Sequence, residues 1–210
     1  MEQRERIIEA AAKMFAEQGI KSIRMDDIAH ALAISKRTLY EMFTDKEELL
    51  YLSIRYMQRK RMAAVQATLC NHSDDLSYIF EIMKQMLKNR ELHTRISNNL
   101  RKFYPATFER VRKEAAEESG KVLYSLIGGY IERGLILPTV DVRLSVTILY
   151  HTTTSLTSMA GNMSLPDGVS FDDAMSYTIV NFFRGLATLK GLQQIDDYFK
   201  RKAEQTKIIE

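Results

Sequence analysis

Apolar residues recur along this chain at intervals of three and four positions, which is the spacing of an α-helix. Near the N-terminus the repeating set is Ile7, Ile8, Ala11 and Phe15. It predicts a helix over about residues 3–18, which Gly19 would end in the left-handed conformation. No stretch alternates apolar and polar residues long enough to indicate a sheet, and proline occurs only three times. We therefore predict an all-α protein.

Two short helices are predicted next, over about residues 25–32 and 36–43, with Ser35 as the N-cap of the second. Helices of this length are marginal in isolation, so they must pack against the first helix. The residues expected to make that contact are Ile28, Leu32, Leu39 and Phe43. Together the three helices would form a small N-terminal head.

Longer helices follow the head. A fourth begins near Lys46, where Asp45 and Glu48 have the spacing of a capping box. Further helices are expected over about residues 76–87, 91–104, 106–133, 140–163 and 171–190, and Gly134 should end the third of these. The tail after them keeps an apolar stripe at Ile195, Tyr198 and Phe199, then turns polar and frays. This gives about nine helices in two domains, 1–47 and 48–210, joined by the long fourth helix.

Composition narrows the functional classes. The chain is 45% apolar and 27% charged, as globular proteins are, and no apolar run approaches the 18 residues of a membrane span. Its first residues lack the apolar segment and cleavage site of a secretory signal, so we expect a cytoplasmic protein. A net charge of +3 permits an anionic partner without requiring one.

Side chains for catalysis or metal binding are sparse. Cys70 is the only cysteine, and the four histidines, at 30, 72, 93 and 151, lie far apart in the sequence. We expect no metal, no cofactor and no internal disulfide. No motif pairs a nucleophile with a base or brings two carboxylates together, so we do not expect an enzyme, although scattered residues could still converge in space.

Hydrogen-bond donors are concentrated in the stretch "ISKRTLYEMFTDKEEL", residues 34–49. On the predicted third helix, Leu39 and Phe43 share one face, Arg37 points away from it, and Lys36 and Tyr40 flank it. Two short helices joined by a tight turn form a helix-turn-helix, whose second helix can enter the DNA major groove. Arginine and lysine read guanine there, and hydroxyl groups bind phosphate.

Lys46 strengthens this interpretation because a cation in the first turn of a helix opposes the helix dipole. The backbone N–H groups at such a helix start could hold a phosphate with it. The alternative is a solvated lysine beside Glu47 and Glu48.

The segment "IRMDDIAHALAISKRTLYEMFTDKEELL" resembles the DNA-binding head of the TetR family of bacterial transcriptional regulators, and the resemblance runs from about Ile7 to Leu50. Together with the donors on the predicted third helix, this resemblance implies that the partner is double-stranded DNA. The expected DNA-binding residues are Arg24, Met25, Ser35, Lys36, Arg37, Thr38, Tyr40 and Lys46. Met25 is the one among them that could serve mostly in packing. Ala33 departs from the family, which usually has glycine in the turn; a left-handed alanine there would cost about 1–2 kcal/mol.

The rest of the chain resembles the family weakly, in "YIERGLILPTVDVRLSVTILY" and "NFFRGLATLKGLQQID". The resemblance implies a cavity for an unidentified small-molecule effector. Candidate lining residues are Phe80, Met83, Phe103, Tyr104, Tyr150 and His151, each of which could instead be plain core. For His151 a satisfied core histidine is the alternative, and for Cys70 the choice is between an inert thiol and a redox sensor.

The resemblance also implies a homodimer formed through the helices at about 140–163 and 171–190. The first is rich in small residues ("HTTTSLTSMAG"), and the second carries Met175, Ile179, Phe182, Phe183 and Leu186, which could equally be intramolecular core. The function expected is a repressor that an effector releases from a palindromic operator. An effector-independent or activating DNA binder and a helical enzyme remain as alternatives.

Overall fold

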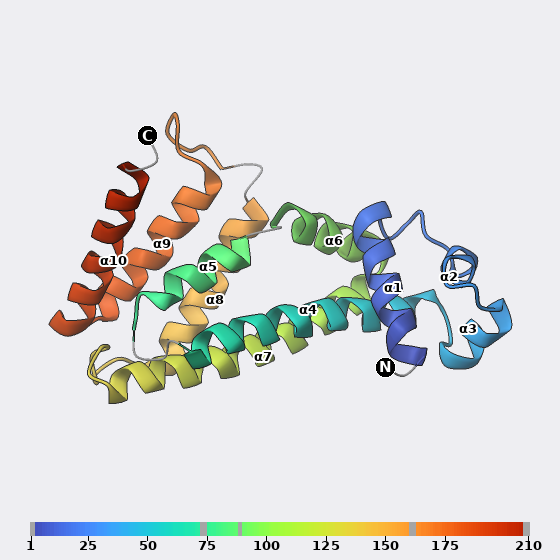
Figure 1. Cartoon of the computed structure of the whole chain (residues 1–210), viewed down its shortest axis with the longest axis horizontal. Coiled ribbons are helices and arrows are strands. Elements are labelled where there is room, and N and C mark those ends of the chain that lie inside the picture. Colours follow the sequence, from blue (N-terminus) through green and yellow to red (C-terminus); the bar gives the residue numbers. More distant parts are fainter. Residues whose placement is uncertain (1–2, 72–74, 88–89, 160–162, 208–210) are drawn as a thin grey trace. The chain divides into compact units, whose positions relative to one another are not determined.

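The computed structural model describes residues 3–71, 75–87, 90–159 and 163–207, and these form ten helices (Figure 1). They are α1 (Gln3–Gln18), α2 (Met25–Ala31), α3 (Lys36–Met42), α4 (Lys46–Asn71), α5 (Tyr78–Leu87), α6 (Arg90–Phe103), α7 (Pro105–Glu132), α8 (Val142–Met159), α9 (Phe171–Leu186) and α10 (Leu189–Lys207). In these ranges the only pairing of strand type is an isolated antiparallel bridge between Ile136 and Ala187. The predicted all-α class is confirmed.

The chain divides into two compact units. The first comprises Met1–Ala64 with Asn89–Glu117, and the second Val65–Lys88 with Glu118–Glu210. The unit that holds the N-terminal head therefore extends beyond residue 47 and includes α6 and the start of α7. The boundary expected between residues 47 and 48, which was drawn around the segment expected to bind DNA, stays a prediction.

The core of the first unit is built as the helical spacing predicted. Ile7, Ala11 and Phe15 of α1 are buried with Ile28 of α2 and Leu39 of α3. α1 contacts both α2 and α6, and α2 contacts α3. The two short helices thus gain from tertiary packing the stability that their length denies them.

The turn between α2 and α3 keeps the left-handed geometry although it lacks glycine. Ala33 has φ 52°, its N–H donates to the His30 carbonyl at 3.1 Å, and the Ile34 N–H donates to the Ala29 carbonyl at 3.0 Å. This pair of bonds is the Schellman arrangement that ends many helices. The alanine therefore carries the conformational cost expected from the sequence, and the turn is not rearranged to avoid it.

Caps at the next two helix starts hold α3 and α4 in place. The Thr38 N–H donates to Ser35 Oγ at 2.9 Å, which confirms Ser35 as the N-cap of α3. At α4 the Glu48 N–H donates to Asp45 Oδ1 at 2.8 Å, while the Glu48 carboxylate accepts from the Thr44 N–H at 2.7 Å. The expected capping box is therefore present, except that the Glu48 carboxylate accepts from the N–H of Thr44 and not from that of Asp45.

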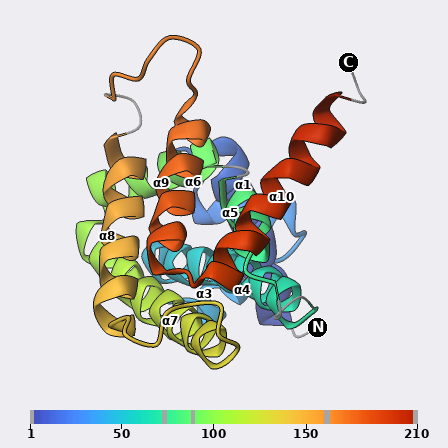
Figure 2. The ribbon, with the colours of Figure 1, turned by 90° about the vertical axis from the view of Figure 1, so that its left-hand side faces the viewer.

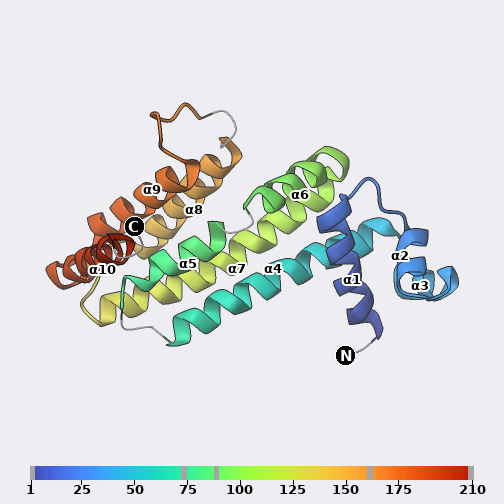
Figure 3. The same cartoon turned by 45° about the horizontal axis from the view of Figure 1, so that its top comes forward.

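The second unit is arranged around α9, which contacts α5, α8 and α10 (Figures 2 and 3). Its core includes Ile127 and Tyr130 from the end of α7, Phe80 from α5 and Phe183 from α9. Gly134 ends α7 with φ 68°, as predicted.

One sequence prediction for this unit was wrong. We expected a single helix over about 171–190 and a fraying tail, but α9 ends at Leu186 and α10 continues to Lys207. Ala187 is extended and bridges to Ile136, and the Leu137 N–H donates to the Leu186 carbonyl at 2.9 Å. Backbone pairing with a distant segment therefore interrupts the helix, and such pairing leaves no trace in the local apolar pattern.

Candidate functional site

The first turn of α3 presents two cations, each paired with a carboxylate. Lys36 Nζ lies 2.9 Å from Asp26 Oδ1, and Arg37 Nε lies 2.8 Å from Glu41 Oε1. The Lys36 and Arg37 side chains remain 61% and 88% exposed. The hydrogen bond that Lys36 donates to Asp26, and then the negative charge of Asp26, raise the pKa of Lys36 and keep the ammonium protonated. Exposed pairs of this kind contribute little stability, so either cation can exchange its carboxylate for another anion.

Hydroxyl groups lie beside these cations. Ser35 Oγ and Thr38 Oγ1 are 2.7 Å apart at the start of α3. Tyr40, one turn further on, is 45% exposed, with Lys36 Nζ 6.0 Å from the centre of its ring. Each hydroxyl can still donate to or accept from a further partner. The structure therefore brings these predicted donors together on the exposed side of α3.

The two predicted residues at the start of α2 lie in different environments. Arg24 is exposed, and its backbone N–H donates to Asp27 Oδ2 at 2.7 Å, which leaves the guanidinium on the surface. Met25 is 5% exposed and belongs to the core of the first unit. Met25 thus acts in packing here, as the sequence allowed.

Lys46 is not the solvated lysine of the alternative interpretation. It is half-buried, and its Nζ donates to the backbone carbonyl of Ile20 at 2.6 Å. Burial lowers the pKa of this ammonium. The cation thus lies just beyond the C-terminal end of α1, where the dipole of that helix favours positive charge.

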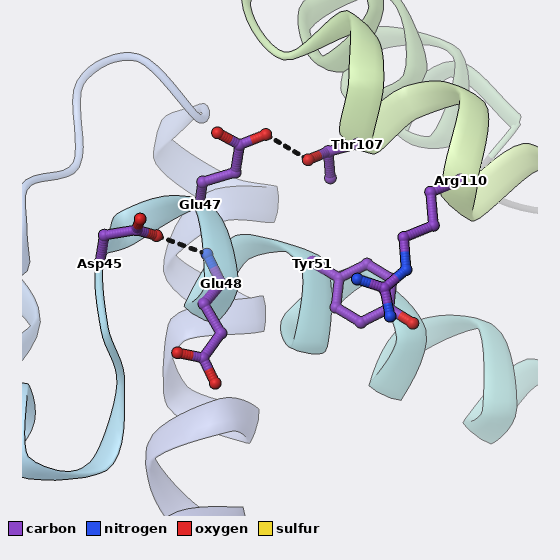
Figure 4. A pocket seen from close by; sticks show the side chains of 6 residues that line it. All are labelled: Asp45, Glu47, Glu48, Tyr51, Thr107 and Arg110. Atoms are coloured by element: carbon purple, nitrogen blue, oxygen red, sulfur yellow. Dashed lines mark hydrogen bonds between the residues drawn. The ribbon is translucent and has the colours of Figure 1, made fainter.

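A hollow of about 300 Å³ opens beside the start of α4, lined by Asp45, Glu47, Glu48, Tyr51, Thr107 and Arg110 (Figure 4). Three of its six lining residues are acidic, and Thr107 donates to the Glu47 carboxylate. The Arg110 guanidinium stacks over the Tyr51 ring, 3.9 Å from its centre. This acidic lining makes the hollow unsuited to a phosphate.

Buried charges join α4 to α7 within the first unit. The Arg55 side chain is only 6% exposed, and its Nε lies 3.0 Å from Glu114 Oε2. The Tyr51 hydroxyl donates to the same carboxylate at 2.8 Å, and Arg110 Nε lies 3.1 Å from it. The Tyr51 hydroxyl above all, and then the two guanidinium groups, lower the pKa of Glu114. The sequence analysis missed this network because a charged residue within a helical stretch gives no local sign that it is buried.

The six candidate effector residues fall into both compact units. Phe80 and Met83 are 2% and 8% exposed in the core of the second unit, where the Phe80 ring packs 5.4 Å from Tyr198. Phe103 belongs to the first unit and is exposed, with Lys21 and Lys102 each 5.4 Å from its ring centre.

Tyr104 is half-buried against the core of the first unit. Tyr150 and His151 belong to the second unit and form an edge-to-face pair at 5.5 Å. His151 is exposed, so the alternative that it is a core histidine is wrong. Within neither unit do all six residues converge.

The expected dimer helices each have a buried and an exposed face. Met175, Ile179 and Phe183 of α9 lie in the core of the second unit, as the intramolecular alternative required. Large apolar side chains elsewhere on these helices face outward: Leu144 (55% exposed), Ile148 (47%) and Met159 (53%) on α8, and Tyr177 (75%) on α9.

No group of three His, Cys, Asp or Glu residues that could hold a metal ion occurs among the described residues. Nor does any helix among them have the length and apolar character needed to cross a membrane. The side chain of Cys70 and the whole of His72 lie outside the described residues.

Comparison with known proteins gives a match for the head of the chain. A sequence model of the family described as "Bacterial regulatory proteins, tetR family" matches residues 7–51. An HTH-type transcriptional regulator of Staphylococcus aureus strain bovine RF122 is 34% identical over 87 residues. The match covers 41% of this chain and 45% of that protein, so the chain spans less than half the length of this curated relative.

Solved structures extend the likeness to most of the chain. A transcriptional regulator from Cytophaga hutchinsonii superposes with a TM-score of 0.75 over 88% of this chain and 98% of its own, at 19% identity. A regulator from Saccharomonospora viridis, solved in complex with choline, gives a TM-score of 0.66 over 88% and 97% at 18% identity. At such identities the likeness shows a common fold and no more.

Proposed function

We propose, from the premise that residues 7–51 belong to the TetR family of bacterial regulatory proteins, that this chain is a sequence-specific DNA-binding transcriptional regulator. The observation that carries the proposal is the first turn of α3. Its Lys36 and Arg37 are exposed and held only by surface carboxylates, on a helix that capping and packing fix in place. A polyanion can displace such carboxylates at little cost.

In this proposal α3 enters the major groove, and Arg37 and Lys36 read base edges. Ser35, Thr38 and Tyr40 bind phosphate oxygens beside them, and Arg24 reaches the backbone from the start of α2. Lys46 and the backbone N–H groups at the start of α4 hold one further phosphate. Met25 supports α2 from the core and makes no polar contact with DNA.

The same proposal includes a homodimer. A single head covers one major groove, and two heads related by a two-fold axis read the half-sites of a palindrome. Leu144 and Ile148 of α8 and Tyr177 of α9 are the exposed apolar residues that suit such an interface. Exposed apolar surface of this kind marks association sites.

We further propose that the protein represses transcription when it is bound to its operator, and that a small-molecule effector releases it from the DNA. An effector that binds only one conformer of the protein shifts the population away from the operator by its difference in affinity. The fold accommodates a small molecule in the S. viridis protein, whose structure holds choline. Residues 70–120 of this chain have no recognisable sequence motif, as expected where relatives bind different compounds.

The test begins with DNA sequences selected by the purified protein from a random pool and measured by gel shift. Arg37→Ala should weaken binding by about 1–3 kcal/mol and relax the preference at one base position. Lys46→Ala should weaken binding to all sequences alike and lower the salt dependence by about one ion.

Arg112→Ala is the matched control, because Arg112 is also an exposed cation paired with a carboxylate, Glu109, at 2.7 Å on α7. It should leave the affinity unchanged. Equal affinities of the wild type and both α3 and α4 variants would refute the DNA-binding assignment.

Two alternatives have their own discriminating results. Weak occupancy of many genomic sites, without one strong palindromic footprint, would indicate an architectural or activating DNA binder. Chemical turnover of a compound that copurifies with the protein would indicate an enzyme.

A further inference from the structure

Arg61 of α4 has no anionic partner among the described residues. The residue is half-buried, and its Nε is enclosed without a hydrogen-bond partner. No described residue makes an ion pair or a hydrogen bond with it. Arginine often keeps its head group in water while its stem packs, but here burial alone lowers the pKa of the guanidinium.

In the first unit, one residue of α6 lies near Arg61, and the residue after it has a second buried polar atom without a partner in the described part of the chain. His93 is half-buried, and its pKa is lowered by burial and then by the positive charge of Arg61, so the imidazole lies within the field of that guanidinium. Thr94, the next residue, has a buried hydroxyl without a partner among the described residues. Met57 and Leu92, close to these residues on the same two helices, pack against the apolar core.

Arg55, a turn and a half earlier on α4, shows how this protein treats a buried arginine of its own structure. Among the described residues, the Nε of both arginines lacks a hydrogen-bond acceptor in good geometry, but Arg55 Nε lies 3.0 Å from Glu114 Oε2 in an ion pair, and Tyr51 and Arg110 contact the same carboxylate. A buried charge without such a partner is strongly unfavourable. The difference between Arg55 and Arg61 indicates that the anion for Arg61 comes from outside the chain.

We propose that Arg61 binds the carboxylate of a small organic acid, with the Thr94 hydroxyl as a second donor. The inference rests on the proposed effector control and names the chemical class of the effector. The planar fork of arginine suits a carboxylate, and one guanidinium beside a neutral imidazole matches a single negative charge. The apolar neighbours favour an acid with a hydrocarbon body over an inorganic anion.

The experiment uses the full chain and four carboxylates: acetate, butyrate, octanoate and benzoate. Octanol and benzamide are the uncharged counterparts, and choline is the cationic one. Binding is measured by calorimetry and by the rise in the thermal unfolding midpoint. At least one carboxylate should bind the wild type at least tenfold more tightly than its uncharged counterpart does, and choline should not bind.

Arg61→Met should weaken the best carboxylate at least tenfold and should raise the unfolding midpoint of the ligand-free protein, because the uncompensated charge is gone. Arg59→Met is the matched control, since Arg59 is exposed on the same helix. It should change neither quantity. If Arg61→Met does not fold, Arg61→Lys keeps the charge without the fork and should weaken the carboxylate severalfold.

The inference is overturned if no carboxylate binds the wild type, if the uncharged compound binds as tightly, or if the Arg61 variants bind the acid like the wild type. The DNA affinity of the wild type and of Arg59→Met, measured without carboxylate, tests the regulator proposal separately. A failure of carboxylate binding therefore leaves the DNA-binding proposal intact, and a failure of DNA binding is detected separately.

Discussion

Arg37 and Arg55 each pair with a glutamate in the same compact unit, yet the two pairs serve opposite purposes. The Arg37 side chain is 88% exposed and pairs with Glu41 one turn away, while Arg55 is 6% exposed and reaches across to Glu114 on α7. An exposed pair is worth little, whereas breaking a buried one leaves a charge that water cannot reach. The exposed Arg37 can therefore exchange its carboxylate for a ligand, whereas the buried Arg55 stabilises the fold.

The same contrast extends to the segments around each pair. The surface around α3 includes a left-handed alanine at position 33 and two surface ion pairs, which together add little stability. The α4–α7 contact has a shared carboxylate that accepts from a hydroxyl and two guanidinium groups. Stability is concentrated away from the surface proposed to bind DNA.

Removing the carboxylate that pairs with the buried Arg55 should have the largest effect. Glu114→Ala should lower the free energy of unfolding by about 2–4 kcal/mol, because Arg55 loses the carboxylate that compensates its charge. The figure is below that of a fully buried pair, since the Glu114 side chain is still 30% exposed. Urea unfolding followed by circular dichroism measures it.

Glu109→Ala is the control for this variant, because Glu109 also pairs with an arginine on α7 but is 61% exposed. Its cost should stay under about 0.5 kcal/mol. Equal losses in the two variants would mean that burial does not distinguish these pairs.

Ala33→Gly should have the next largest effect, and in the opposite direction. It should raise the free energy of unfolding by about 0.5–1 kcal/mol, because glycine relieves the left-handed strain but costs some chain entropy. The α3 surface is otherwise unaltered, so the DNA affinity should stay within twofold. A loss of stability would show that the turn does not strain the alanine.

Glu41→Gln should tighten DNA binding about twofold, since the exposed pair that competes for Arg37 is worth about 0.3–0.5 kcal/mol. Stability should barely change. Quantitative gel shifts at fixed salt measure the gain, and Glu109→Gln, far from α3 in the sequence, provides the reference. A tenfold loss of affinity would instead assign Glu41 a direct contact with bases.

The smallest effect concerns pH. Because the pKa of Glu114 in the folded protein lies below its ordinary value of 4.5, the ionised carboxylate stabilises the fold above that pH, and this contribution is lost as the pH falls through the folded pKa. The difference in free energy of unfolding between wild type and Glu114→Gln should therefore be constant between about pH 5 and 7 and decline below about 4.5. A difference that grows in acid would contradict the assigned direction.

The helices and the head could be read from the sequence because they depend on local signals. Apolar spacing predicted α1, the serine before α3 predicted its cap, and glycines at 19 and 134 predicted two helix ends. The break at Ala187 depends on pairing with Ile136, which lies far earlier in the chain, so no local pattern contained it.

The candidate site was predictable to the same extent. Lys36, Arg37 and Tyr40 share the exposed side of one helix, so helical geometry was sufficient to group them. Which charges are buried depends on the packing of distant helices, and for that reason Arg55, Glu114 and Arg61 escaped the sequence analysis. The residues proposed as a cavity lining were grouped by residue type alone, and the structure divides them between two units.

The junction of α9 and α10 limits how this protein can be recombined with its relatives. A side-chain carbon added at Gly191 would lie 2.2 Å from the Leu135 carbonyl oxygen, and Thr188 Oγ1 donates to the Gly134 carbonyl at 2.7 Å. The start of α10 thus packs closely against the loop after α7 and is hydrogen-bonded to it. A chimaera that takes α9 and α10 from a relative must therefore also take residues 134–137 from it, because otherwise the two segments will not pack together.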